Sequence, residues 1–165
     1  MLQTTYDSPL GQLTLLANEI HLLGLWYQNQ AHFGAHYSLK TIDHGTSPIL
    51  QQTIRWLEDY FNGHHPAIAP LPLHPQTTPF RQQVYQILTT IPYGQTMSYQ
   101  QIADRLSELN SPKMGSARAV GGAVGHNPIG IIIPCHRVIG SNGSLIGYAG
   151  GLKRKRQLLA FEQRN

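Results

Sequence analysis

The first third of the chain alternates short apolar runs with turn-forming residues. Runs rich in Leu, Thr and aromatic residues occupy positions 3–6, 12–17 and 20–27, and Ser8-Pro9-Leu10-Gly11 and Asn18-Glu19 separate them. Short runs of this composition, bounded by Gly, Pro, Asn and Ser, are typical of strands joined by tight turns. The pattern therefore predicts a meander of antiparallel strands.

A change to helical spacing follows this region. Ser47 is a typical N-cap, Pro48 suits the first helical position, and Asn62-Gly63 forms a stop signal. Apolar residues recur between them at intervals of three or four, which predicts a helix over residues 48–61. They are Ile49, Leu50, Ile54, Leu57 and Phe61.

A proline-rich segment and a change in charge divide the chain. Residues 64–79 contain five prolines, which fit neither a helix interior nor a central strand, so an extended connection is expected. Residues 1–75 carry two basic and five acidic side chains, whereas residues 76–165 carry ten basic and three acidic ones. We therefore predict two domains, 1–75 and 76–165. The second is basic enough to bind a polyanion, although the run Lys153 to Arg156 is also consistent with a solvated helix face.

Helix signals recur in the second part. Thr78 and Pro79 predict the start of one helix, and Ser98 with Gln101 forms a capping box for another. A polar stretch, residues 107–115, then precedes a helix of small residues that begins at Ser116. Two short helices joined by a turn resemble a helix-turn-helix, a weak signal because many such hairpins bind nothing.

The helix of small residues contains Gly121, Gly122 and Gly125. Each glycine costs about 1 kcal/mol relative to alanine inside a helix, so another interaction must offset that cost. Close approach of the backbone to a DNA groove is one explanation, and tight packing against a neighbouring helix is the other.

Cys135 is the single cysteine of the chain, which excludes a disulfide framework and favours a reducing, intracellular location. The apolar run 131–133 predicts a buried strand that Pro134 ends, and His136 follows the thiol as a base or imidazolium able to lower its pKa. Direct contact between adjacent side chains would need an irregular backbone. A buried structural cysteine is the alternative, and Glu162 either orients His136 or is an ordinary surface carboxylate.

The residues around Cys135 carry a resemblance to a known family. The Pro-Cys-His-Arg-Val core at 134–138 and its ordered flanks resemble the O6-alkylguanine-DNA alkyltransferases, also called methylated-DNA–protein-cysteine methyltransferases. The specific match covers about residues 78–162. The flanks that match are Arg118-Ala-Val-Gly-Gly-Ala, Asn127-Pro128, Gly147-Tyr148, Gly150-Gly151-Leu152, Thr78-Pro79-Phe80, Ile91-Pro92-Tyr93-Gly94 and Ser98-Tyr99.

The resemblance implies a fold and a reaction. The expected fold is an α/β N-terminal supporting domain, a small antiparallel sheet with helices similar to ribonuclease H. A mostly α C-terminal domain with a winged helix-turn-helix-like motif follows, which would hold the DNA-binding surface and the active site. The reaction is irreversible, single-turnover transfer of an alkyl group from O6-alkylguanine, and more weakly O4-alkylthymine, in duplex DNA to a cysteine. No cofactor and no metal are expected.

Residue roles follow from the same resemblance. Cys135 would accept the alkyl group, and His136 would act on the thiol through a water while Glu162 holds the imidazole tautomer. Asn127 would bridge this network, and Tyr99 would supply the hydrogen bond or proton to the leaving guanine.

The resemblance also assigns the DNA contacts. Arg118 would fill the space left by the flipped base, and its helix would enter the minor groove. The expected DNA-binding residues are Arg118, Tyr99, Ala119, Gly121 and Gly122. The expected base pocket consists of Tyr148, Ala149, Val138, Ile139 and Pro134.

Three departures from the family pattern stand out. The segment between Tyr99 and Arg118 is several residues longer than expected, which affects how the turn approaches DNA. Tyr85 occupies a position expected to hold tryptophan. Ala149 replaces a frequent serine, so one hydrogen bond to the guanine is expected to be missing.

Other functions and sites remain as alternatives. A non-catalytic alkylated-DNA-binding or regulatory module is one, although relatives that only bind such DNA lack the cysteine. A cysteine hydrolase using Cys135 and His136 is another, and it would turn over. His32 and His36 are four positions apart and His64 and His65 are adjacent, which leaves an all-histidine zinc site as an alternative. We expect a monomer without membrane association, with cooperative binding along DNA left open.

Overall fold

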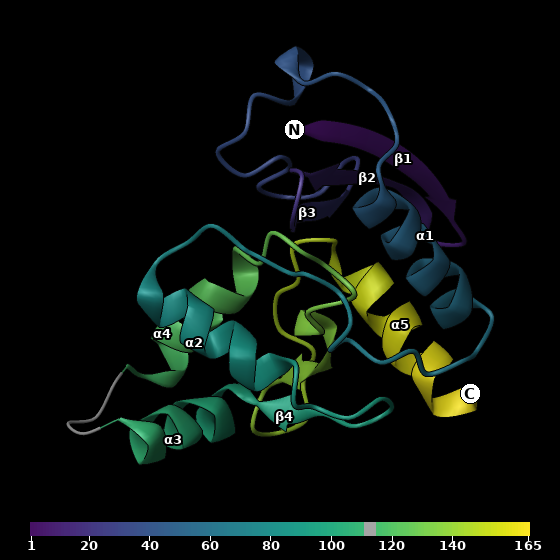
Figure 1. The fold of residues 1–165 in the computed structure, drawn as a ribbon. Helices are drawn as coiled ribbons and strands as arrows, with labels where there is room; N and C mark the ends of the chain where they lie inside the picture. The colour runs from purple at the N-terminus through teal and green to yellow at the C-terminus, as the bar shows by residue number, and fades with distance from the viewer. Residues whose placement is uncertain (111–114) are drawn as a thin grey trace.

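The computed structural model describes residues 1–110 and 115–165, with a three-stranded sheet beside a group of helices (Figure 1). Strands β1 (Leu2–Ser8), β2 (Gly11–Ala17) and β3 (Leu22–Tyr27) are antiparallel in that order, so the predicted meander is confirmed. The third strand begins after position 20 because the Asn18 side chain accepts hydrogen bonds from two following backbone N–H groups and closes a turn.

The predicted helix is α1 (Pro48–Phe61), which lies against the sheet. The Ser47 side chain accepts a hydrogen bond from the Leu50 N–H, and Gly63 adopts φ +84° after the helix ends. A short 3₁₀ turn, η1 (Leu39–Thr41), precedes it.

The outer edge of β3 is covered by two other segments of the chain. The proline-rich connection bonds to it through Leu22, whose N–H donates to the Pro72 carbonyl at 2.8 Å and whose carbonyl accepts from His74. Further along, the Leu25 N–H donates to Pro128 at 2.8 Å, and its carbonyl accepts from Gly130. The N-terminal sheet therefore anchors the segment that leads to Cys135.

Three helices form the C-terminal helical group: α2 (Pro79–Leu88), α3 (Tyr99–Leu109) and α4 (Ala117–Gly125). Thr78 and Ser98 cap the first two as predicted, and both hydrogen bonds of the Ser98–Gln101 capping box are present. Ser116, expected as the first residue of the third helix, is its N-cap. Residues 107–109 belong to α3, so the polar stretch starts later than predicted. Most of the long insertion, residues 111–114, lies outside the described residues.

The segment around Cys135 differs from the prediction. Residues 131–133 form buried turns, and Ile131 has φ +66°, so the predicted strand is wrong. Cys135–Arg137 form a 3₁₀ turn, η2, followed by β5 (Val138–Ile139), which pairs in parallel with β4 (Met97–Ser98). The last helix is α5 (Leu152–Arg164).

One hydrophobic core extends through both halves of the chain, joining Leu25 of the sheet and Leu57 of α1 to Val84 of α2 and Leu158 of α5. The division near residue 75 therefore stays a prediction. Within the described ranges, no helix is long and apolar enough to cross a membrane.

Candidate active site

Cys135 lies in η2, where its side chain is almost completely buried. The Nδ2 of Asn127 donates to its Sγ at 3.2 Å and to the Ile133 carbonyl at 2.9 Å. The Oδ1 of Asn127 accepts from the Ile129 N–H. Asn127 thus holds both the turn and the thiol, as the resemblance implied.

The surroundings of the thiol act on its pKa in opposite directions. Burial raises the pKa of Cys135 above its ordinary value, because a thiolate loses solvation in the interior. The hydrogen bond from Asn127 and the charge of Lys155 favour the thiolate and lower that pKa. With its pKa raised, the resting cysteine is a protonated thiol, which must give up its proton to react as a nucleophile.

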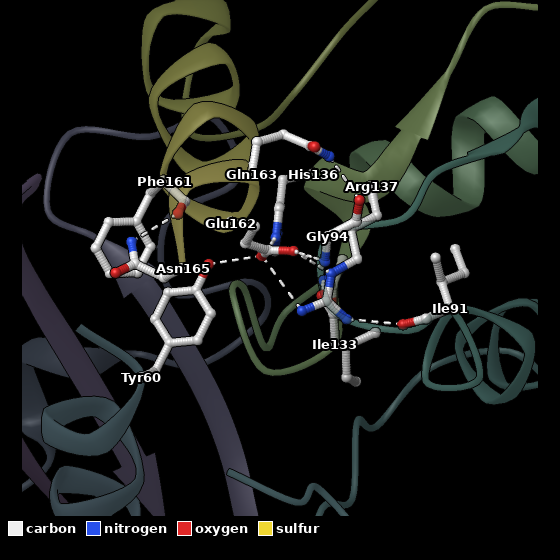
Figure 2. Close-up of polar contacts among 11 residues, drawn as sticks. Tyr60, Ile91, Gly94, Ile133, His136, Arg137, Phe161, Glu162, Gln163 and Asn165 are labelled. Carbon is white, nitrogen blue, oxygen red and sulfur yellow. Dashed lines mark hydrogen bonds and ion pairs between the residues drawn. The ribbon is translucent and has the colours of Figure 1, made fainter. Parts of the chain in front are cut away.

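His136 is fully buried, and its Nε2 contacts Glu162 Oε2 at 2.5 Å (Figure 2). Because η2 replaces a regular strand at this point, adjacent residues Cys135 and His136 both lie in the interior. Glu162 comes from α5 and its side chain is buried, so the interpretation of this residue as a surface carboxylate is wrong.

Glu162 receives hydrogen bonds from several directions (Figure 2). Arg137 donates from Nε to Oε1 at 2.7 Å and from a terminal nitrogen to Oε2 at 3.2 Å, and it also bonds to the Ile91 carbonyl. The Gly94 N–H donates to Oε1 at 3.0 Å, and the Tyr60 hydroxyl donates to Oε2 at 2.7 Å. Burial alone would raise the pKa of Glu162, but the bonds from His136 and Arg137 hold it well below its ordinary value. Glu162 is therefore ionised at neutral pH.

The protonation of His136 follows from these contacts. Burial lowers the pKa of His136, with Arg137 and Lys155 adding to the effect and Glu162 opposing it. A neutral imidazole beside a carboxylate donates its Nε2–H to that carboxylate, which leaves Nδ1 with a lone pair. Nδ1 is buried and has no hydrogen-bond partner among the described residues. His136 therefore presents an available base.

Lys155 is fully buried, so the interpretation of Lys153 to Arg156 as a solvated face is wrong at this position. Its Nζ donates to the carbonyls of Val138 and Gly147, the latter at 3.0 Å. Burial lowers the pKa of Lys155 to about 8. The ammonium thus ties β5 to Gly147 within the glycine-rich loop, residues 140–151, and places a positive charge near Cys135.

A cavity of about 210 Å³ lies between the glycine-rich loop and α4. Tyr99, Tyr148, Ala149 and Gly121 are among the residues that line it. The Tyr99 hydroxyl donates to the Ile146 carbonyl at 2.5 Å. Of the other residues expected in a base pocket, Pro134 and Val138 are buried and Ile139 is half-buried, but none lines this cavity.

Four of the five expected DNA-binding residues lie on α4, and the fifth, Tyr99, is the first residue of α3. Arg118, Ala119 and Gly122 are exposed, and Gly121 is half-buried. A methyl group at Gly122 or Gly125 would meet no described atom within 4 Å, and one at Gly121 would reach only the Tyr99 ring at 3.9 Å. Tight packing against the described neighbours therefore does not explain these glycines, which leaves close approach of an external partner.

Three residues of the site were not predicted as functional: Arg137, Lys155 and Tyr60. The spacing of Lys155, Leu158 and Glu162 places them on one face of α5, a signal visible in the sequence. Nothing local indicates that Tyr60 reaches Glu162, because that contact joins α1 to α5. Among the described residues, no group of three or more His, Cys, Asp or Glu side chains is arranged to hold a metal ion.

Comparison with known proteins agrees with the fold and shows the family. The model of the 6-O-methylguanine DNA methyltransferase, ribonuclease-like domain, matches residues 1–75, and that of the 6-O-methylguanine DNA methyltransferase, DNA binding domain, matches residues 79–164. The chain belongs to the 6-O-methylguanine DNA methyltransferase family.

Two relatives in this family are named methylated-DNA–protein-cysteine methyltransferase. One, from Haemophilus influenzae, is 38% identical over 97% of this chain and 85% of its own. The other, from Mycobacterium tuberculosis, is 43% identical over 96% and 90%. A crystal structure of Mycobacterium tuberculosis OGT in complex with DNA superposes with a TM-score of 0.84 at 42% identity, covering 99% of this chain and 94% of that one.

Proposed function

We propose that this chain repairs DNA by moving the alkyl group of O6-alkylguanine, and more weakly that of O4-alkylthymine, to Cys135. The observation that carries the proposal is the arrangement Cys135, neutral His136 and ionised Glu162. It combines a buried thiol with an available imidazole nitrogen on the next residue of the chain. The names of the relatives support the same reaction.

The reaction follows from the acid–base properties of these groups. A water relays the thiol proton to Nδ1 of His136, and Glu162 stabilises the imidazolium that forms. Sγ then attacks the alkyl carbon, a C–S bond forms and the C–O6 bond breaks, and its electron pair stays with guanine. The Tyr99 hydroxyl turns from the Ile146 carbonyl to hydrogen-bond the leaving base, and the proton held by His136 returns to guanine.

The target base must leave the helix before this step, because its O6 lies inside the base stack. Arg118 is the exposed side chain at the start of α4, and it fills the vacated space when the helix enters the minor groove. The small residues Ala119, Gly121 and Gly122 allow the backbone to approach the phosphates, with no side chain there to read sequence.

The thioether product has no route back to a free thiol in this site, so each molecule acts once and needs no cofactor. This stoichiometry separates the proposal from a cysteine hydrolase, which would turn over, and from a binding module, which would leave the lesion intact. We also expect a monomer acting in the cytoplasm, with cooperative binding along DNA open to test.

Titration provides the test of single turnover. Increasing amounts of protein are added to a fixed amount of duplex containing O6-methylguanine, and the remaining lesion is measured at completion. We expect one lesion removed per active protein molecule, and none with Cys135→Ala. Removal of many lesions per molecule, or of none by the unaltered protein, would contradict the proposal.

A further inference from the structure

Glu162 receives one of its hydrogen bonds from a distant part of the chain. His136, Arg137 and Gly94 belong to the same half as the cysteine, whereas Tyr60 belongs to α1, beside the N-terminal sheet (Figures 1 and 2). The Tyr60 hydroxyl and the His136 Nε2 bond to the same oxygen, Oε2, at 2.7 and 2.5 Å. The N-terminal half therefore bonds to the carboxylate oxygen that also holds the base of the reaction, His136.

The ring of Tyr60 is held firmly by its surroundings. It stacks on Trp56 with centroids 5.5 Å apart and an interplanar angle of 7°, and it lies 5.7 Å from Phe161 and 5.9 Å from Tyr93. The side chain is 1% exposed. Because aromatic neighbours on α1, α5 and the turn before Gly94 surround the ring, its hydroxyl oxygen is held within hydrogen-bond distance of Glu162 Oε2.

We propose that Tyr60 is a positioning residue for the alkyl transfer: its hydroxyl fixes the Glu162 oxygen that orients His136 and limits how strongly that oxygen binds the imidazole. This inference rests on the proposed function for its effect on rate. It gives the N-terminal half a chemical contribution in addition to its support of the fold.

The shared oxygen sets the direction of the effect. Each hydrogen bond that Oε2 accepts reduces the negative charge it offers to the others, so loss of the Tyr60 hydroxyl makes it a stronger acceptor for His136. A stronger acceptor favours the imidazolium in the resting protein, and a protonated His136 has no lone pair to take the thiol proton. The other groups that act on His136 are the charges of Arg137 and Lys155, and the phenols of Tyr60 and Tyr93 lie near Glu162. Of these groups, a Tyr60→Phe substitution removes only the Tyr60 hydroxyl.

The test is Tyr60→Phe, which removes one oxygen and keeps the aromatic stack. Tyr85→Phe is the matched control, since Tyr85 is also buried and its hydroxyl donates to the Ala123 carbonyl at 2.9 Å, away from Glu162. The rate of Cys135 alkylation by free O6-benzylguanine is measured from pH 5 to 9. We expect the acid limb of the profile to move to higher pH by roughly half a unit in Tyr60→Phe. We expect no such shift in Tyr85→Phe.

A second measurement is independent of the alkyl transfer. The imidazole proton on His136 Nε2 is followed by ¹H–¹⁵N NMR in both variants, and we expect its resonance to move in Tyr60→Phe alone. An unchanged resonance and an unchanged profile in Tyr60→Phe, with the unaltered protein alkylated normally, would overturn this inference and leave the proposed function intact. If the unaltered protein is not alkylated, the proposed function fails, and the NMR comparison still decides whether Tyr60 controls the pair.

Discussion

Lys155 is the buried charge that local reasoning assigned to the surface. A buried ammonium is stable only when its N–H groups find acceptors, and here the backbone carbonyls of Val138 in β5 and of Ile146 and Gly147 in the glycine-rich loop supply them. The side chain combines two roles, since it closes the loop that borders the cavity and its charge favours the thiolate of Cys135. Charge and loop geometry at the site thus depend on one residue.

Replacement of this lysine tests its electrostatic role. We expect Lys155→Met to raise the pKa of Cys135, because the positive charge that favours the thiolate is lost. The rate of alkylation by free O6-benzylguanine at neutral pH should then fall by about tenfold for each unit of that rise. The exposed neighbour on the same helix provides the control, Lys153→Met, which should react at the normal rate. Equal rates for the two variants would show that the Lys155 charge does not act on the thiol.

At the scale of elements, local chemistry predicted the helices and strands well. Ser47, Thr78 and Ser98 cap helices where expected, because an N-cap depends on a hydroxyl and backbone N–H groups a few residues away. The prediction of a strand at residues 131–133 is wrong, because a short apolar sequence is compatible with any buried backbone. The backbone there turns, and the Asn127 side chain bonds to the carbonyls of Ile129 and Ile133.

The surface of α4 allows a test that separates folding from DNA binding. A larger side chain at Gly122 meets open space among the described residues. It also removes the conformational cost of glycine, so Gly122→Leu should leave the free energy of unfolding unchanged or raise it by about 1 kcal/mol. The variant should repair duplex DNA more slowly because the helix no longer approaches the groove closely. Urea unfolding and a duplex repair assay measure the two effects, and unimpaired repair would argue against groove entry by this helix.

Arg118 on the same helix tests base flipping. Arg118→Ala should slow repair in duplex DNA by at least tenfold and leave transfer from free O6-benzylguanine nearly unchanged, since a free base needs no flipping. Arg164→Ala, which removes an exposed arginine from the end of α5, is the charge-matched control. If Arg118→Ala slows both substrates equally, the arginine acts on the chemistry and the flipping role is wrong.

At the scale of the whole molecule, the contacts that complete the site join distant segments. The resemblance located Cys135, His136, Asn127 and Glu162 from their order along the chain. The hydrogen bond from Tyr60 to Glu162 spans 102 positions, and the edge of β3 holds Pro128 and Gly130. Such contacts depend on how the halves of the chain fold together, so spacing and periodicity do not reveal them.

The buried His136–Glu162 pair predicts how stability depends on pH. The pKa of His136 is lowered on folding, so below about pH 6.5 the unfolded chain binds a proton that the folded chain does not, and stability falls on acidification. Glu162 adds a second loss below its ordinary value of 4.5, because its pKa is also held low in the folded state. Urea midpoints between pH 7.5 and about 3 measure both effects, the His136 effect above pH 4.5 and the Glu162 effect below it. We expect a shallower decline between pH 7 and 5.5 in His136→Gln, and an identical decline would show that His136 does not contribute.

The fate of the Cys135 thiol tests the central claim most directly. The protein is incubated with duplex DNA containing O6-methylguanine, digested, and the peptide carrying Cys135 is analysed by mass spectrometry beside an untreated sample. We predict that Cys135 gains one methyl group in proportion to the lesion lost from the DNA, and that heating or prolonged incubation does not release it. An unmodified Cys135 peptide, whether the lesion persists or disappears, would contradict the account.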